Sequence, residues 1–260
     1  MDFDPLDTIE IRGVRLRRDP AREQCFVVAH HETEVQSARD YSSVTAVRSM
    51  LHREYNNETQ NAEIAAQTIV DFPDAPWDLR MQLARQCWDE TRHARMFLRR
   101  VVELGGRKGE SPIKNGDWAV VGMIDNLPGR LLVQHRLFEG GVIDSFRQVA
   151  QGFRDSGDAR TAEIYDVILA DEIQHVRFAN HWLRHFSHEP RAVMQMASAL
   201  TFAAGALRKL APLPGDRSID GIDLASIDHR ISINVEDRIR AGFTEAEIAD
   251  LEEKDSASQS

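Results

Sequence analysis

Hydrophobic and polar positions divide the chain into a short region with a period of two and a long region with a helical period. Between Ile9 and Arg17, apolar and charged residues alternate on both sides of Gly13, which predicts a strand pair or an extended arm. From Ser43 onward, long segments with few breakers predict helices instead. We therefore expect a small N-terminal arm attached to a helical body.

Proline, glycine and polar clusters set the ends of the predicted helices. These span about 45–71, 76–104, 117–153 with a kink or restart at Pro128, 159–186 and 190–210, and a last short helix follows the capping box Thr244 to Glu247. The first four form two helical hairpins joined by a longer crossover, the topology of a ferritin-like four-helix bundle. The predicted class is all-α. The predicted domains are an extended arm or strand pair at 1–42, a ferritin-like helical domain at 43–210, and a tail at 211–260 that wraps on the bundle and is disordered from 255.

One short motif occurs in both predicted hairpins. Residues 89–93 read Asp-Glu-Thr-Arg-His, and residues 171–175 read Asp-Glu-Ile-Gln-His. Helical residues i and i+3 lie on one face about a turn apart, so each Glu-x-x-His can close on a single metal ion. Two such pairs, each joined by a Glu from another helix, are the ligand set of ferritin-like dinuclear carboxylate proteins. The repeat supplies four of these ligands, namely Glu90, His93, Glu172 and His175.

The fifth ligand follows from height along the first hairpin, because each helical residue advances about 1.5 Å. Glu58 precedes the turn near Asp74 by the same number of residues by which Glu90 follows that turn, so the two side chains should lie at the same height. Glu63 lies nearer the turn and on a different face, so it is held in reserve.

The sixth ligand lies in the second hairpin. Apart from Asp144, Glu139 is the acid nearest in height to Glu172, and it lies in an apolar segment where an unpaired carboxylate would be costly. The alternative is a buried Glu paired with a cation. The adjoining glycines at 140–141 would permit a helical bulge, a common feature beside functional sites. A role for His135, one turn before Glu139, stays open.

Three more side chains are predicted to act around the metals. A ligating imidazole usually donates its other N–H to a carboxylate. We expect Asp89 to hold His175 and Asp171 to hold His93 across the bundle, the alternative being that both are solvated acids. Tyr165, two turns before Glu172, could relay an electron or donate a hydrogen bond to a metal-bound species.

Composition narrows the class of protein. A net charge of −10 disfavours a large nucleic-acid footprint, and the basic run at 12–22 is interpreted as a solvated strand or loop. Two cysteines without a Cys-x-x-Cys pair argue against a disulfide framework. No apolar run has membrane-spanning length, and the acidic start differs from a signal peptide, so we expect a cytoplasmic protein.

Two resemblances rest on these motifs. The stretch 89–93 resembles the Asp-Glu-x-Arg-His signature of bacterial diiron monooxygenases, although Gln174 replaces the Arg in the second copy. More extensively, the segments 72–77, 88–93, 171–175 and 234–247 resemble a family of bacterial ferritin-like proteins of uncharacterised function, similar in layout to the tRNA-modifying diiron hydroxylase. This resemblance covers roughly residues 45–250 and implies a dinuclear iron centre in a four-helix core, with no substrate.

Together these features predict a non-haem diiron oxygenase or oxidase. It would bind two Fe ions, or one Mn and one Fe ion as an alternative. It would use O2 as co-substrate to hydroxylate, desaturate or otherwise oxidise a small organic molecule. An external reductase or small reductant would supply electrons, and we expect a monomer or homodimer. The alternatives are a ferroxidase, a peroxidase-type ferritin-like protein, and a tRNA hydroxylase.

Overall fold

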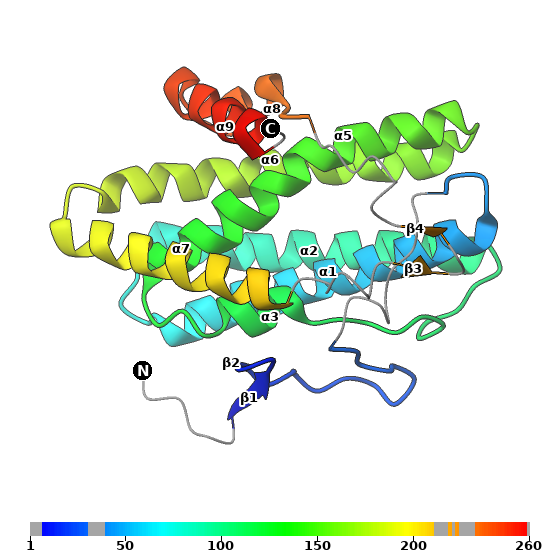
Figure 1. Cartoon of the computed structure of the whole chain (residues 1–260), viewed down its shortest axis with the longest axis horizontal. Coiled ribbons are helices and arrows are strands. Elements are labelled where there is room, and N and C mark those ends of the chain that lie inside the picture. Colours follow the sequence, from blue (N-terminus) through cyan, green and yellow to red (C-terminus); the bar gives the residue numbers. More distant parts are fainter. Residues whose placement is uncertain (1–6, 31–39, 211–217, 220–221, 224–231, 259–260) are drawn as a thin grey trace.

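The computed structural model describes residues 7–30, 40–210, 218–219, 222–223 and 232–258. This part of the chain is mostly helical, with long helices lying side by side along the longest axis of the molecule (Figure 1). A small two-stranded sheet lies near the N-terminus, so the predicted helical body with a strand pair is confirmed. Among the described residues, no helix combines the length and apolar character needed to cross a membrane.

Two helical hairpins make up the body. The first joins α1 (Val44–Asp71) to α2 (Trp77–Glu103), and the second joins α5 (Gly140–Asp155) to α6 (Ala159–Phe186). The hairpins meet where α2 packs on α6. The observed ends of α1, α2 and α6 lie close to those predicted from the breakers, and α5 ends two residues after the predicted end at 153.

Local chemistry explains where α1 and α6 begin. The Ser43 hydroxyl accepts the Ala46 N–H at the start of α1, and the Asp158 carboxylate accepts the Thr161 N–H at the start of α6. Gly157 precedes that cap with a φ of +87°, a left-handed conformation that suits glycine in a tight turn. Arg100 of α2 also donates to both oxygens of Asp158 at 2.9 Å, which ties the two hairpins together.

The crossover between the hairpins is not one continuous helix. It contains α3 (Gly116–Val121), α4 (Leu127–Leu131) and an eight-residue π-helix, η3 (Leu132–Glu139), which runs directly into α5. The Asn126 side chain caps α4 and Pro128 lies in its first turn, so the restart predicted at Pro128 is present. The predicted bulge is present too, although it precedes the glycines at 140–141 rather than including them.

The N-terminal arm is anchored to this body. Strands β1 (Thr8–Ile11) and β2 (Val14–Arg17) pair antiparallel, and Leu16 packs in the core beside Trp118 of α3. Arg22 donates to Glu63 of α1 at 2.6 and 2.7 Å, and its side chain is only 9% exposed. The interpretation of the basic run as solvated is therefore wrong for Arg22, because an acid on α1 binds this guanidinium.

C-terminal elements cover parts of the two hairpins. Helix α7 (Pro190–Leu210) packs on α4, and α8 (Val235–Arg240) packs on α5 and α6. Strands β3 (Ser218–Ile219) and β4 (Ile222–Asp223) form a second antiparallel pair. Helix α9 (Glu245–Ser258) extends past 255, where disorder is predicted, and residues 259–260 lie outside the described residues.

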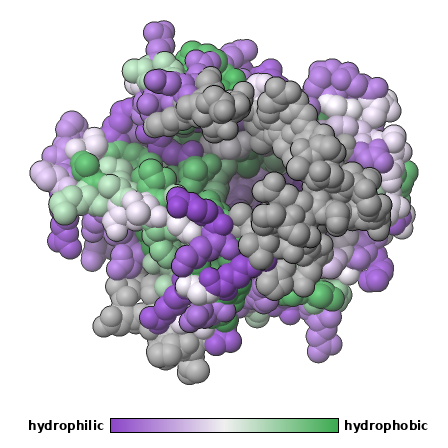
Figure 2. All heavy atoms as spheres, viewed as in Figure 1, coloured by the Kyte–Doolittle hydropathy of each residue, from purple (hydrophilic) through white to green (hydrophobic). Residues whose placement is uncertain are grey.

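Apolar side chains gather on the surface of α7. Val193, Met194 and Leu200 are each more than 40% exposed. Figure 2 shows hydrophilic side chains over much of the same view, with apolar ones concentrated on the left, where α7 lies. The main core lies deeper, where Phe97, Phe146 and other aromatic residues fill the space between α2, α5 and α6.

Candidate metal centre

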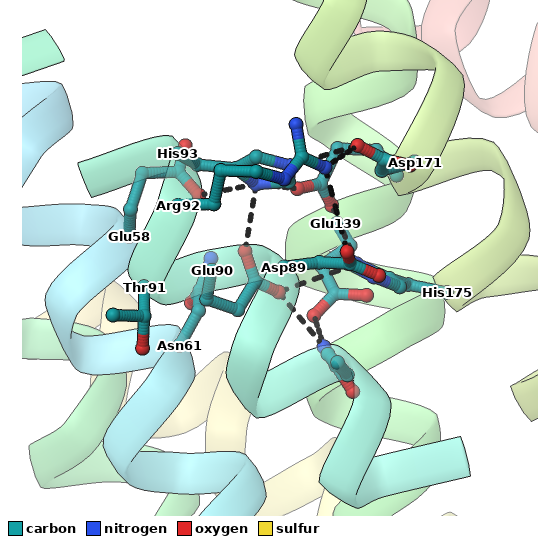
Figure 3. Close-up of polar contacts among 12 residues, drawn as sticks. Glu58, Asn61, Asp89, Glu90, Thr91, Arg92, His93, Glu139, Asp171 and His175 are labelled. Atoms are coloured by element: carbon teal, nitrogen blue, oxygen red, sulfur yellow. Dashed lines mark hydrogen bonds and ion pairs between the residues drawn. The ribbon is translucent and has the colours of Figure 1, made fainter. Parts of the chain in front are cut away.

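The six predicted ligands meet inside the molecule. Glu58 comes from α1, Glu90 and His93 from α2, Glu139 from the last position of η3, and Glu172 and His175 from α6. None of the six is more than 3% exposed. Figure 3 shows side chains from these facing helices extending toward one another.

These residues form two overlapping groups, each of which could hold a metal ion. The first contains Glu58, Glu90, His93 and Glu172, and the second contains Glu90, Glu139, Glu172 and His175. Within each group, one ligand atom per residue lies within 4.8 Å of the others. Glu90 and Glu172 belong to both groups, so their carboxylates face both positions.

Both imidazoles present Nδ1 to the centre. His93 Nδ1 lies 3.1 Å from Glu90 and 3.4 Å from Glu58, and His175 Nδ1 lies 3.2 Å from Glu90. The i,i+3 spacing of each Glu-x-x-His places both side chains of a pair on one helix face, as the sequence predicts.

Each imidazole turns its other nitrogen toward an aspartate of the opposite helix. His93 Nε2 lies 3.1 Å from Asp171 Oδ2, and His175 Nε2 lies 3.5 Å from Asp89 Oδ2. Both expected pairings are therefore present. Arg92 links them, because its guanidinium contacts both aspartates (Figure 3). These contacts orient the two rings across the interface between α2 and α6.

Two amide side chains donate hydrogen bonds to the carboxylates of the centre. Gln86 donates to Glu90 at 3.0 Å and to Glu139 at 2.7 Å. Gln134 donates to Glu139 at 3.1 Å, and His135 Nε2 lies 3.0 Å from the Gln86 carbonyl oxygen. His135 thus contacts an amide that touches two candidate ligands.

Burial and the crowding of charged groups shift the pKa values of the candidate ligands and of His135. Burial raises the pKa of Glu58 and of Glu139 well above the usual value, and neighbouring carboxylates add to this. Burial alone would lower the pKa of His93, but the neighbouring carboxylates of Asp171, Glu58 and Glu90 raise it to about 12. His135 differs, because burial and the nearby His175 lower its pKa to about 3. It therefore stays neutral at physiological pH.

Unsatisfied atoms point to what the centre would bind. Five buried atoms of the candidate ligands have no hydrogen-bond partner among the described residues: Glu58 Oε2, Glu139 Oε2, both Glu172 oxygens and His175 Nδ1. Such buried groups are costly unless they are neutralised or coordinated. Four carboxylates carry a charge of about −4 when ionised, which two divalent cations would balance. The residues present therefore fit a pair of metal ions.

Other residues considered from the sequence lie elsewhere. Glu63 pairs with Arg22 and is absent from both groups, so Glu58 rather than Glu63 lies beside the other candidate ligands, as the height argument predicts. Tyr165 packs against Phe146 and other aromatic residues, and its hydroxyl has no hydrogen-bond partner among the described residues. Cys87 is a half-buried free thiol.

Several supporting residues escaped sequence reasoning. Gln86 precedes Glu90 by four positions, a helical spacing that could have revealed it. Arg92 stands inside the motif itself, but nothing in the sequence shows that it reaches two aspartates. Gln134 reaches Glu139 across five positions, a spacing that only the π-helix explains.

Comparison with known proteins gives a match to one protein family. No curated protein and no solved structure matches the chain. The model of one family, described as "Protein of unknown function (DUF455)", matches residues 7–211. This match covers both hairpins, all six candidate ligands and most of the N-terminal arm. The chain therefore belongs to the DUF455 family.

Proposed function

We propose that this protein is a ferritin-like dinuclear non-haem iron oxidoreductase that uses O2 to oxidise a small organic substrate. The observation that carries the proposal is the meeting of four buried Glu and two buried His in two groups that share Glu90 and Glu172. Two metal positions bridged by carboxylates, with one imidazole at each, are the arrangement found in ferritin-like di-iron carboxylate proteins.

The fold supports the same conclusion. The hairpin α1–α2 packs on the hairpin α5–α6, and each contributes one Glu-x-x-His. Glu58 of α1 and Glu139 of η3, which runs directly into α5, supply the two further carboxylates. We propose that these helices form the four-helix bundle of the ferritin-like class, with α7 to α9 and the N-terminal arm added around it.

The donor set favours iron or manganese. Carboxylate and imidazole ligands suit these metals, whereas closed structural zinc sites are mostly built with cysteine. The only cysteines of the chain, Cys25 and Cys87, belong to neither group. Iron in both positions would supply redox chemistry with O2.

The chain's own residues would bind the metal ions, orient the ligands and exclude bulk water. Asp171 and Asp89 hold a proton on the outer nitrogen of each histidine, which leaves Nδ1 free to coordinate. The Gln86 amide donates to Glu90 and Glu139 and restrains both carboxylates. Burial of all six ligands keeps bulk water away.

The test measures metal content and O2 consumption together. The purified protein, loaded anaerobically with ferrous iron, should bind two metal ions per chain and consume O2 when supplied with a reductant. Glu58→Ala and Glu172→Ala should each bind less metal and lose O2 consumption. Glu63→Ala is the matched control, because Glu63 lies on the same helix as Glu58 but pairs with Arg22.

Two outcomes would refute the proposal. One is retention of two metals by Glu172→Ala, and the other is an absence of O2 consumption with any reductant. Mass spectrometry of candidate metabolites after aerobic turnover separates the alternatives. Gain of oxygen or loss of hydrogen supports an oxygenase or oxidase, whereas accumulation of ferric iron without product supports a ferroxidase.

A further inference from the structure

The two copies of the repeat differ at two positions, and the second of these, Arg92 in one copy and Gln174 in the other, bears on access to the candidate centre. Arg92, just before His93, contacts both Asp89 and Asp171, and the cavity that it lines includes no candidate ligand. Its counterpart before His175 is Gln174, which is exposed and lines a cavity instead. The departure from the repeat therefore coincides with an opening beside His175.

This cavity lies between α2 and α6 and has a volume of about 380 Å³. Its floor is buried and consists of Gln86, Asp89 and His175, each no more than 6% exposed. The volume falls within the range of about 300–1,000 Å³ typical of small-molecule sites. Because Gln86 also donates to Glu139 and Glu90, the floor touches three candidate ligands.

The residues that line the cavity favour an anionic ligand with an apolar part. Arg85 and Arg177 line the cavity. Arg85 also pairs with Asp89 at 3.4 Å, whereas Arg177 forms no ion pair with a carboxylate in the described part of the chain. The aromatic ring of Phe178 supplies an apolar wall. A guanidinium binds carboxylates through paired hydrogen bonds, and this cavity places two guanidinium groups in the same lining as the candidate ligand His175.

We propose that this cavity binds a small organic carboxylate, with its carboxylate on Arg177 and Arg85 and its apolar body against Phe178. The far end of the molecule would rest on Gln86 and His175. This inference rests on the proposed function in one respect: the bound carboxylate would be the substrate or an effector of the metal centre. Binding itself requires only the cavity.

The repeat offers a matched control for the experiment. Arg177 and Arg95 occupy the same position after the histidine of each copy, and both are exposed. Arg95 lies on α2 outside this cavity. Arg177→Gln and Arg95→Gln therefore make the same change of charge in equivalent places, and neither residue is a candidate ligand.

Calorimetric titration should use benzoate, phenylacetate and hexanoate, with acetate and benzyl alcohol to test the carboxylate and the ring separately. The full-length protein is titrated both before and after loading with iron. At least one of the three larger carboxylates should bind more tightly than acetate and benzyl alcohol. Arg177→Gln should weaken that binding about tenfold, and Arg95→Gln should leave it unchanged.

The results separate this inference from the proposed function. If none of the carboxylates binds better than benzyl alcohol, or if both variants behave alike, the carboxylate site is wrong even where the protein binds two metals and consumes O2. If binding depends on Arg177 but the protein takes up no metal, the carboxylate site stands and the metal function fails. A change in the absorption spectrum of the iron-loaded protein on adding the carboxylate would further support contact through Gln86 and His175.

Discussion

The orientation of His93 depends on a single aspartate. Asp171 accepts from Nε2 of this imidazole at 3.1 Å and also binds Arg92. The hydrogen bond from His93, helped by Arg92, lowers the pKa of Asp171 to about 2, so this carboxylate is ionised at neutral pH. An ionised acceptor fixes the ring and its tautomer, which keeps Nδ1 available for a metal.

Removing this acceptor should weaken metal binding. We expect Asp171→Ala to lower the affinity for metal by about 10–100-fold, the usual cost of losing a partner of a metal-bound histidine. Competition against a chelator of known affinity measures this change. Asp166→Ala is the control, because Asp166 lies on the same helix but is exposed and pairs with Arg154 at the surface. Equal affinities of the two variants would contradict the orienting role of Asp171.

At the scale of elements, the π-helix η3 sets the surroundings of Glu139. A π-helix has a wider turn than an α-helix, so residues five apart lie nearly above one another. This register brings Gln134 to Glu139 and His135 to Gln86. The element therefore positions both amide contacts of this carboxylate.

Deleting one residue from η3 should relax it to an α-helix. Leu137 is suitable because it is 38% exposed. Its deletion keeps Glu139 in register with α5 but rotates Gln134 and His135 by about 100° around the helix. We expect weaker metal binding with unchanged helix content by circular dichroism. Leu137→Ala, which keeps the chain length, should bind metal normally; full metal affinity in the deletion would show that the π-helix is dispensable.

The link between η3 and α9 gives a pH-dependent prediction. Thr244 and Glu247 form a reciprocal cap, and Arg136 of η3 binds Glu247 at 2.8 Å. Burial alone would raise the pKa of Glu247, but the Thr244 N–H and Arg136 lower it below the ordinary value of 4.5. A depressed carboxyl pKa stabilises the fold above the pKa of the unfolded chain, and this contribution is lost as pH falls through the folded-state value.

Glu247→Gln should therefore destabilise the protein by about 1 kcal/mol at pH 7, since the cap and the ion pair are partly exposed. The difference in free energy of unfolding from the wild type should shrink below about pH 4.5, where Glu247 gains a proton in the unfolded chain. Urea unfolding at several pH values measures this. A difference that does not change with pH would exclude the charge on Glu247 as its cause.

The sequence predicts this site well where the helices are regular. Glu58 follows from equal heights in a hairpin of two α-helices, because a constant rise per residue holds along both. The aspartate contacts follow from the repeat and the known habit of ligating histidines. The contacts of Gln134 and His135 do not follow, because the glycines at 140–141 predict a bulge but neither the extent of the π-helix nor its register. The pairing of Arg22 with Glu63 depends on how the arm docks, which periodicity does not encode.

At the scale of the whole molecule, four of the acidic residues that give the chain its net charge of −10 are buried together in this centre. Four carboxylates lie together with two imidazoles in the two groups of candidate ligands. In the metal-free protein, Glu58 and Glu139 relieve this crowding by holding protons, since their pKa values are raised by burial. Metal ions would replace those protons and satisfy atoms that otherwise lack partners.

Bound metal should therefore stabilise the entire fold. A ligand that binds only the folded state adds about 2.7 kcal/mol of stability when its free concentration is 100 times the dissociation constant. We expect chelation to lower the midpoint of thermal unfolding, and added ferrous or manganous ions to restore it. Glu172→Ala should show no response to the chelator, because its loss removes a ligand common to both positions. An unchanged midpoint in wild-type protein whose metal has demonstrably been removed would mean that these six residues hold their positions without any ion.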